Sequence, residues 1–351
     1  MAGPTYQDIG RRAGVSTATV SRVLSGKGGV RDELARRVEA TAATLGYRSN
    51  RAAKTLRTQR ADAIGLVISD VENPFFASIA RAVETVAAKQ GYAVLLCNTD
   101  EDLDQEALYL DLLIGESVAG VIIAPSTEEL GPLRQLVDAG IPTVTVDRKV
   151  AGDPFDAVLV DHRAGARGLV EHLLDHGHRH IAAIMGTTAA TPSRERLAGC
   201  REAVEAVDGA RLTVYEGELQ DAVGATRTMG LGERLALNLL DRGRDRPTAV
   251  FCANNLLTQG ALRAVRRSGR RVPDDLAVVG FDDLPFFELV DPPLTVAAQP
   301  TEQLGRLVAE VLFERIFEPG RPLEVVVVDP EIQIRASCGP HPEQLTSPSR
   351  G

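Results

Sequence analysis

This sequence of 351 residues contains no tryptophan and no long apolar run. No stretch reaches the roughly 18 uninterrupted apolar residues that a membrane-spanning helix requires. Residues 1–12 are polar and charged, whereas a secretory signal has an apolar core. These absences predict neither a membrane span nor a leader, and we expect the protein to stay in the cytoplasm.

Cysteine is also scarce. Cys97, Cys200, Cys252 and Cys338 lie far apart, mostly in apolar surroundings, and no two of them form a Cys-x-x-Cys pair. This pattern is typical of reduced core cysteines rather than of a disulfide framework. The composition, 44% hydrophobic and 25% charged, excludes the disordered and fibrous classes.

Motifs for catalysis are missing as well. The sequence has no Gly-x-Ser-x-Gly elbow, no Walker loop and no Rossmann glycine fingerprint. Nothing brings a nucleophile together with a base, so we predict no enzyme. His172 and His176 are spaced like a helical metal pair, with His178 and His180 close behind, but no acidic or cysteine partner follows at ligand spacing. We therefore expect no metal and no cofactor.

The formal net charge of −9 argues against a nucleic-acid binder only until it is divided along the chain. Residues 1–60 carry twelve Arg or Lys against four Asp or Glu, a balance of +8, whereas residues 61–351 carry 27 against 44, a balance of −17. Such asymmetry favours a basic module that meets phosphates, carried by an acidic body. Small helical domains are often basic for solubility alone, so charge does not decide the function.

The apolar pattern changes at residue 60. Before it, short amphipathic helical patterns predict a small all-α domain; after it, continuous Val-, Ile- and Leu-rich runs alternate with helical stretches. Such strands, separated by helices, are what a parallel sheet covered on both faces requires. We predict a doubly wound α/β body, whose length favours two lobes over one. The expected strands are 63–69, 93–97, 118–124, 143–146, 181–185, 249–253 and 277–281.

The basic segment carries clear helix start and stop signals. Thr5 and Asp8 form a predicted capping box, with Asp in place of the usual Glu or Gln. Gly14 is expected to end that first helix. Ser16 can cap a second helix over 17–25. The short interval between the two helices predicts a tight turn.

A third helix begins near Asp32 and ends at Gly46, which completes a helix-turn-helix pattern. In this motif the second helix lies in the major groove, so its outward residues Thr17, Ala18 and Arg22 are candidate readers of base edges. Arg22 can pair bidentately with guanine, and the other two suit thymine methyl contacts or weaker hydrogen bonds. A three-helix bundle whose polar face does nothing is the open alternative.

Two runs carry a specific resemblance: TYQDIGRRAGVSTATVSRVLSG, starting at Thr5, and LGYRSN, ending at Asn50. They resemble the headpiece of the LacI/GalR repressor family almost residue for residue. In that family a short hinge helix follows the asparagine, forms only on the operator and inserts a leucine into the minor groove. The resemblance implies that Leu56 is the wedge and that Ala53 packs beside it; an ordinary linker leucine is the alternative. The predicted DNA contacts are Thr5, Ser16, Thr17, Ala18, Ser21, Arg22, Ser25, Arg31, Asn50, Ala53 and Leu56.

One departure from the family pattern lies at Arg31, where a Ser or Thr usually caps the third helix. We expect Asp32 to take over the capping, which would leave Arg31 free to contact phosphate. Because the departure is beside the DNA surface, it bears on phosphate geometry rather than on the fold.

The body, from residue 61 to about 336, resembles the core of the same family, which shares its two-lobed fold with periplasmic sugar-binding proteins. Ligands bind such sheets at the carboxyl ends of the strands. The segment SDVENPFF, which begins at Ser69, is similar to a family segment whose aromatic residues pack on the ligand. This implies a ligand role for Asn73, Phe75 and Phe76 in a chain with only nine Phe. Ordinary core packing at a helix start is the alternative for Phe76.

Asp147 ends another expected strand in a pattern similar to the family's Val-Asp-Arg. A carboxylate at this position can accept hydrogen bonds from two sugar hydroxyls. Asp161 opens a helix and could merely cap it. We therefore assign Asp147, but not Asp161, to the effector site.

The other candidate ligand residues lie further along the chain. Arg196 stands in SRERLAG, similar to the family's Ser-x-x-Arg-x-x-Gly, with a surface arginine in helix salt bridges as the alternative. Asn254 matches the family, whereas Asn255 replaces a usual Asp, which we expect to alter helix capping or lobe contacts. Asp282 stands in GFDD, and Gln299 in the return crossing between the lobes. The predicted effector site is Ser69, Asn73, Phe75, Phe76, Asp147, Arg196, Asn254, Asp282 and Gln299.

A second departure is the stretch 225–232, which we expect to add a surface loop at the entry of a helix. Leu219, at a position that is frequently aromatic in the family, is an uncertain lining residue. Both features would lie near the mouth of the predicted cleft.

The resemblance sets the predicted domains. They are a headpiece over 1–49, a hinge helix and linker over 50–60, an effector-binding and dimerisation domain over 61–338, and a disordered tail over 339–351. Within the large domain, the first lobe is expected to comprise about 61–160 and 292–321. The second is expected to comprise about 161–291 and 322–338.

The leading hypothesis is a homodimeric DNA-binding regulator, most simply a repressor, on a near-palindromic double-stranded operator. A small polar effector, such as a sugar or nucleoside, would modulate its operator binding. The alternatives are a solute-binding protein with an incidental helical extension and an enzyme that shares the two-lobed fold. The basic first sixty residues distinguish the regulator from both.

Overall fold

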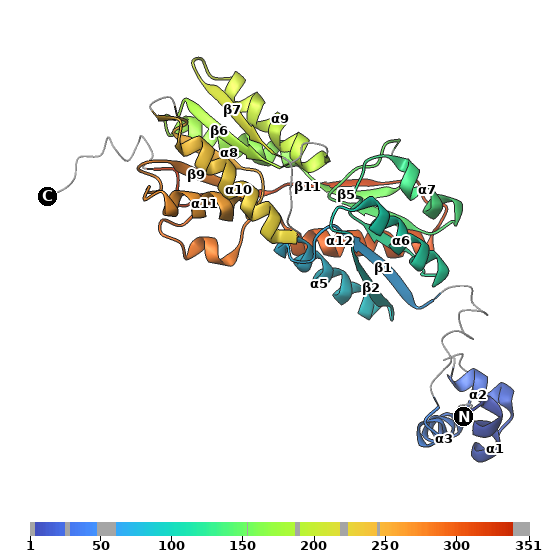
Figure 1. Cartoon of the computed structure of the whole chain (residues 1–351). Coiled ribbons are helices and arrows are strands. Elements are labelled where there is room, and N and C mark those ends of the chain that lie inside the picture. Colours follow the sequence, from blue (N-terminus) through green and yellow to red (C-terminus); the bar gives the residue numbers. More distant parts are fainter. Residues whose placement is uncertain are drawn as a thin grey trace. The chain divides into compact units, whose positions relative to one another are not determined.

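The computed structural model describes residues 4–24, 29–47, 61–152, 154–186, 190–217, 224–243 and 246–339. The chain forms two compact units, Met1–Ala61 and Asp62–Gly351 (Figure 1). Several predicted features lie outside the described residues: the hinge with Asn50, Ala53 and Leu56, and also Ser25, Leu219 and the tail beyond 339.

The first unit is all-α, as predicted. It consists of α1 (Tyr6–Ala13), α2 (Thr17–Leu24) and α3 (Asp32–Thr44). Each helix contributes apolar residues to one small core. The fully or almost fully buried members of that core are Ile9, Ala13, Val20, Val38 and Ala42.

The start and end of α1 follow the predicted signals. Thr5 Oγ1 accepts a hydrogen bond from the Asp8 backbone N–H at 3.3 Å, and the Asp8 carboxylate accepts one from the Thr5 N–H at 2.9 Å. This reciprocal pair is the predicted capping box. Gly14 ends the helix in the left-handed region, with φ of 66°. Ser16 then caps α2 by accepting a hydrogen bond from the N–H of Thr19 at 3.1 Å.

The prediction that Asp32 caps α3 is wrong. Asp32 is the first residue of the helix itself, and Arg31 occupies the N-cap position without a capping hydrogen bond from its side chain. A guanidinium has no acceptor atom, so Arg31 could not cap the helix amides. Asp32 instead places its negative charge in the first turn, where the helix dipole favours it.

The second unit contains two lobes, each built on one sheet. The sheet of the first lobe is parallel throughout, with strand order β11-β5-β4-β3-β1-β2. Its strands are β1 (Ala63–Ile68), β2 (Ala93–Asn98), β3 (Val121–Ile123), β4 (Thr143–Val146), β5 (Asp156–Val160) and β11 (Val325–Val328).

Helices cover both faces of this sheet (Figure 1). α5 (Pro74–Lys89) and α12 (Thr301–Phe317) share one apolar cluster with the sheet. α6 (Leu103–Gly115) and α7 (Leu130–Asp138) share the other. Burial on both faces explains why most of these strands are continuously apolar.

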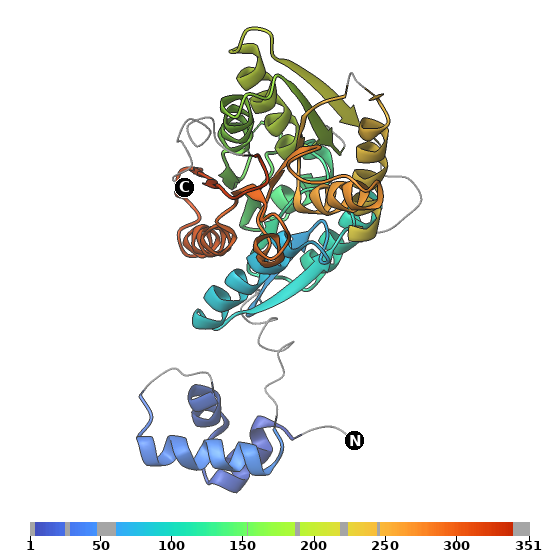
Figure 2. The same cartoon turned by 90° about the vertical axis from the view of Figure 1, so that its left-hand side faces the viewer.

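The sheet of the second lobe has the order β12-β10-β9-β8-β6-β7, with β12 antiparallel to β10 and the other pairs parallel. In this lobe α8 packs against α9, and α10 packs against α11 (Figure 1 and Figure 2). The strands are β6 (His180–Met185), β7 (Arg211–Glu216), β8 (Ala249–Cys252), β9 (Ala277–Phe281), β10 (Thr295–Ala298) and β12 (Glu331–Gln333). The helices are α8 (His162–Asp175), α9 (Thr191–Glu205), α10 (Gly224–Leu240), α11 (Asn255–Arg267) and the 3-10 helix η2 (Pro285–Glu288).

The predicted lobe boundaries at 292 and 322 need correction. β10 pairs with β9 in the second lobe, although it lies within the span 292–321 assigned to the first lobe. β11 pairs with β5 in the first lobe, although it lies within the span assigned to the second. The chain therefore crosses between the lobes after β5, after β10 and after β11. An apolar strand pattern does not say which sheet a strand joins, because that choice depends on tertiary pairing.

The prediction of a surface loop at 225–232 is also wrong, because this stretch lies inside α10. α10 packs closely against α11 because glycines face backbone at the contact. A Cβ at Gly260 would lie 2.1 Å from the carbonyl oxygen of Met229, and a Cβ at Gly232 would lie 2.4 Å from that of Leu257. Gly232 and Gly260 thus allow the close approach of the two helices.

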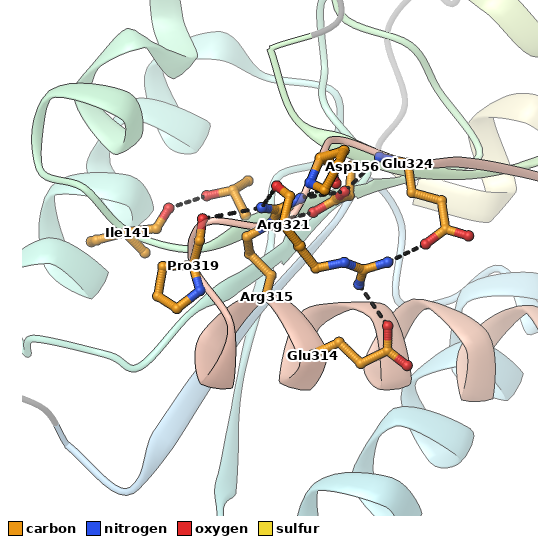
Figure 3. A network of polar contacts seen from close by, with 9 residues as sticks. Ile141, Asp156, Glu314, Arg315, Pro319, Arg321 and Glu324 are labelled. Carbon is orange, nitrogen blue, oxygen red and sulfur yellow. Dashed lines mark hydrogen bonds and ion pairs between the residues drawn. The ribbon is translucent and has the colours of Figure 1, made fainter.

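A buried ion pair fixes the connection between α12 and β11 (Figure 3). Arg315 Nε and Nη2 donate to the carboxylate of Asp156 at 2.8 and 2.9 Å. Arg315 also donates to the backbone carbonyls of Pro319, Arg321 and Pro322. Asp156 accepts the N–H of Glu324 at 2.8 Å as well, so the pair holds both ends of the loop.

All four cysteines are buried and unpaired, as predicted. Burial raises the pKa of the Cys252 thiol to about 12, which keeps it protonated at neutral pH. In the part of the chain that the structure describes, no helix is long and apolar enough to cross a membrane.

Candidate functional site

The carboxyl ends of strands from both lobes line one cavity of about 300 Å³. This volume is near the lower end of the range for small-molecule sites, about 300–1,000 Å³. All of the residues predicted to form the effector site line it: Ser69, Asn73, Phe75, Phe76, Asp147, Arg196, Asn254, Asp282 and Gln299.

The first lobe contributes a polar cap and two aromatic rings. Asn73 caps α5 by accepting a hydrogen bond from the Phe75 N–H at 3.1 Å. Phe75 and Phe76 meet edge to face, with ring centroids 4.9 Å apart. Both rings are buried in the lobe's apolar core and also line the cavity. The core and ligand interpretations of Phe76 are therefore compatible.

Asp147 lies at the centre of a polar chain that connects the lobes. Its carboxylate is buried, its φ is 67°, and its Oδ1 lies 3.0 Å from His162 Nε2. Burial alone would raise the pKa of Asp147, but the contact with His162 and the nearby guanidinium of Arg196 lower it below its ordinary value. Asp147 is therefore an ionised acceptor at neutral pH.

Arg196 extends this chain in the second lobe. Its Nη1 donates to the carbonyl of Ala253 at 2.6 Å, and its Nη2 donates to His162 Nδ1 at 3.2 Å. Its guanidinium carbon lies 3.9 Å from the centroid of the Phe281 ring, a cation–π contact. The side chain is buried, so the interpretation of Arg196 as a surface arginine in salt bridges is wrong.

The order of donors along this chain indicates which ring nitrogen of His162 acts as an acceptor. Because Arg196 can only donate, Nδ1 must accept, and a neutral ring then carries its proton on Nε2, which faces Asp147. His162 thus presents an acceptor to the arginine, and its Nε2 lies 3.0 Å from the carboxylate without forming a hydrogen bond to it. The imidazole connects the two charged groups.

Asp282 and Asn255 form a second connection. Asp282, with φ of 72°, accepts the N–H of Asn255 at 3.2 Å and the side-chain amide of Gln299. Asn255 is fully buried, and its Nδ2 donates across the lobes to Asn73 Oδ1 at 2.9 Å. The departure at Asn255 therefore affects lobe contacts. Asn254 caps α11 through the N–H of Leu257.

Several cavity residues were not predicted. Asp70 and Asp100 follow β1 and β2, Ser126 follows β3, and Arg148 follows β4. Arg148 forms a bidentate ion pair with Glu101: its Nη1 donates to Oε2 at 2.7 Å and its Nη2 donates to Oε1 at 2.5 Å. The rule that ligands meet the carboxyl ends of strands would have found these residues had it been applied to every strand. Asp161, by contrast, caps α8 through Ala164 and does not line this cavity.

A contact at the edge of the lobes joins Glu128 of the first to α9 of the second. Glu128 accepts hydrogen bonds from the hydroxyl of Thr191 and from Arg194, the latter at 2.9 Å. These groups are partly exposed, so solvent weakens the ion pair.

The histidine cluster makes hydrogen bonds within the second lobe. His176 Nδ1 contacts the carbonyl of His172 at 2.8 Å, His178 Nδ1 contacts Thr248 and His180 Nε2 contacts Thr213. Among the described residues, no group of three or more His, Cys, Asp or Glu is arranged to hold a metal ion.

The predicted DNA-reading side chains lie on the outer face of the first unit. Thr17, Ala18 and Arg22 are exposed on α2, whereas Ser21 is half-buried. Thr5 and Ser16 are exposed caps, and Arg31 is exposed at the start of α3. The described candidates thus cluster at the starts of helices and along α2.

Two family models match the chain. The model of bacterial regulatory proteins of the lacI family matches residues 5–50, and that of the periplasmic binding protein-like domain matches residues 170–338. The chain is 37% identical to the ribose operon repressor of Halalkalibacterium halodurans over 315 residues, which are 89% of this chain and 90% of that protein. The chain therefore belongs to the lacI family of bacterial regulatory proteins, which confirms the predicted resemblance.

Solved structures agree with this family. The Lac repressor dimer bound to operator and the anti-inducer ONPF superimposes with a TM-score of 0.84 at 26% identity, covering 97% of this chain and all of that one (100%). The complex of the transcriptional regulator CelR with cellobiose has a TM-score of 0.68 at 34% identity, covering 95% of this chain and 99% of that one. Both comparisons confirm the predicted fold, an α-helical headpiece followed by a two-lobed α/β domain.

Proposed function

We propose that this protein is a cytoplasmic repressor that binds a specific operator. Its affinity for the operator falls or rises when a small polar effector, such as a sugar, fills the cavity. The observation that carries the proposal is the combination of a family headpiece with exposed Thr17, Ala18 and Arg22, and a cavity lined by every predicted effector residue. No catalytic step is part of the proposal. The ribose and cellobiose named for two relatives support a sugar.

The cavity explains how an effector would be held. Asp147 and Asp282 supply acceptors for hydroxyl groups, and Arg196 supplies donors. The rings of Phe75 and Phe76 offer apolar surface to a sugar face. A ligand that touches both lobes favours the arrangement in which the lobes are closest.

The coupling to DNA would follow from that preference. The effector biases the lobe arrangement, and the linker over 50–60 transmits the bias to the headpiece. Such coupling is typically about 1–3 kcal/mol, or about 5- to 150-fold in operator affinity.

A homodimer is part of the proposal because a near-palindromic operator matches a two-fold symmetric protein. Exposed apolar side chains support it in both lobes: Leu108 and Leu112 on α6, and Phe286 and Leu289 at η2. The comparison structure is itself described as a dimer on its operator. Sedimentation of the full chain at micromolar concentration should show a dimer.

Fluorescence anisotropy tests the DNA-binding function. A labelled palindromic duplex from the protein's own promoter is compared with a scrambled duplex over a range of salt concentrations. We expect a clear preference for the operator, and Arg22→Ala should reduce that preference by about 1–3 kcal/mol. Arg37→Ala, which removes an equal charge from the exposed side of α3, is the control and should leave the preference in place. Equal, weak binding of both duplexes would favour a solute-binding protein instead.

A further inference from the structure

The lining of the cavity between the lobes carries an excess of negatively charged side chains. Among the described residues that line it, carboxylates outnumber guanidinium groups by five to two. The cavity therefore differs from an anion-binding site, which gathers cations and helix amides. The carboxylates belong to Asp70, Asp100, Glu101, Asp147 and Asp282, and the guanidinium groups to Arg148 and Arg196.

Both guanidinium groups already have partners. Arg148 uses Nη1 and Nη2 on the carboxylate of Glu101. Arg196 donates to Ala253 and stacks on Phe281. A phosphate binds arginine most strongly through two parallel N–H donors of one fork. Neither arginine can offer such a fork without losing its present contacts.

Asp70 and Asp100 are in the opposite situation. In the described part of the chain, neither carboxylate takes part in an ion pair. Asn98 holds them on the first lobe: its Nδ2 donates to Asp100 Oδ1 at 2.9 Å, and its Oδ1 accepts the N–H of Val71, the residue after Asp70, at 2.7 Å. Burial raises the pKa of Asp70, and the charges of Glu72 and Asp100 add to that rise.

Other polar atoms of the site indicate what would satisfy it. Arg148 Nε and Arg196 Nε are buried donors, and Gln299 Oε1 is a buried acceptor; none of the three has a hydrogen-bond partner within the described residues. Buried polar groups usually find partners. A hydroxyl both donates and accepts, so a polyol matches a lining of mixed donors and acceptors, whereas a phosphate dianion only accepts and adds charge beside the carboxylates.

We propose that Asp70 and Asp100 act as a charge filter, so that the cavity admits an uncharged, hydroxyl-rich effector and excludes its phosphate ester or carboxylate. This inference rests on the proposed function, because it concerns the same cavity. The two residues determine specificity by repulsion, which is a common route to discrimination between similar ligands.

Isothermal titration of the full-length protein tests the filter with D-ribose, D-glucose and the 5- and 6-phosphates of these sugars. The Asp70→Asn/Asp100→Asn double variant keeps the side-chain shape and the oxygens that accept the present hydrogen bonds. Asn also tolerates the positive φ of 52° at position 100. Asp111→Asn, on the exposed side of α6 and outside the cavity, is the control for a change in net charge.

In the wild type we expect a neutral sugar to bind about 100-fold more tightly than its phosphate, the factor that one like-charge pair gives at about 6 Å and an effective dielectric constant of about 20. The double variant should reduce this ratio at least about 10-fold, and Asp111→Asn should leave it unchanged. Equal binding of sugar and phosphate to the wild type, or an unchanged ratio in the double variant, would overturn the filter.

If no sugar of the panel binds the wild type, the double variant still tests the filter. A phosphate that then binds the double variant supports the filter, and failure of every ligand on both proteins overturns it. Operator binding is measured separately by anisotropy on the same preparations. Loss of operator preference would refute the regulator function. If operator preference is intact but the ratio of sugar to sugar-phosphate affinity does not behave as expected, the filter alone is refuted.

Discussion

His162 connects the two lobes through a single imidazole ring. Its Nδ1 accepts a hydrogen bond from Arg196 in the second lobe, and its Nε2 lies 3.0 Å from Asp147 Oδ1 in the first. We predict that His162→Leu weakens effector binding and leaves operator binding without effector close to the wild-type value. The physical reason is that the imidazole connects the lobes through Asp147 and Arg196, which line the cavity.

The magnitude follows from the groups left without a partner. Leucine removes the acceptor from a buried guanidinium and the neighbour from a buried carboxylate. A hydrogen bond to a charged group contributes about 1.5–3 kcal/mol. The loss of one such contact from the effector-bound arrangement should weaken effector binding about 10- to 100-fold.

Isothermal titration with the tightest-binding sugar of the panel measures the change, and His162→Gln is the matched variant. The glutamine amide donates through Nε2 and accepts through Oε1, as the neutral imidazole does through its two nitrogens. It should recover most of the lost affinity, to within about 5-fold of the wild type, since about 1 kcal/mol is the net value of one imperfect hydrogen bond. Wild-type affinity in His162→Leu, or equal losses in both variants, would refute the role of His162 as donor and acceptor.

Asp156→Ala leaves a buried arginine without its carboxylate, so urea denaturation should show a loss of about 3–5 kcal/mol in the free energy of unfolding; a loss below about 1 kcal/mol would contradict this. Gly260→Ala drives a Cβ into the backbone of α10 and should lower Tm by several degrees, whereas Gly230→Ala, where a Cβ meets open space, should raise it slightly. Glu128→Gln should weaken effector binding less than about 5-fold, because its ion pair with Arg194 is partly exposed. Although partial burial opposes it, the hydrogen bonds to Glu128 lower its pKa, so the contribution of this carboxylate is present at neutral pH and is lost as the pH falls through that lowered value; a binding profile that is flat in the acid range would contradict this.

Apolar strands were the most predictable part of the fold. The predicted runs 143–146 and 277–281 coincide with β4 and β9, because both faces of these strands are buried. β7 (Arg211–Glu216) was missed because it lies at a sheet edge and alternates polar with apolar residues. β11 (Val325–Val328) is apolar but largely exposed, and its sequence does not reveal that it belongs to the first lobe.

The candidate site was predictable to the extent that it follows the strand ends. Asp147 and Asp282 both directly follow a strand, both adopt a positive φ and both line the cavity. Contacts between lobes were not predictable in the same way. His162 and Asn255 become partners of the first lobe only through tertiary packing, and no spacing along the chain encodes that approach.

Asn73 and Asn254 show why helix caps and ligand residues are hard to separate by sequence. In this fold a helix begins where a strand ends, so the N-cap of the helix lies at the same sheet edge as the ligand. Asn254 Oδ1 accepts the N–H of Leu257, and Asn73 Oδ1 accepts that of Phe75, yet both residues line the cavity. An amide oxygen has two lone pairs, so the cap occupies one acceptor site at Asn254 and leaves the second for a hydroxyl. At Asn73 the second site is already taken by Asn255, so an effector hydroxyl that hydrogen-bonds Asn73 must use its amide N–H groups or displace a contact between the lobes.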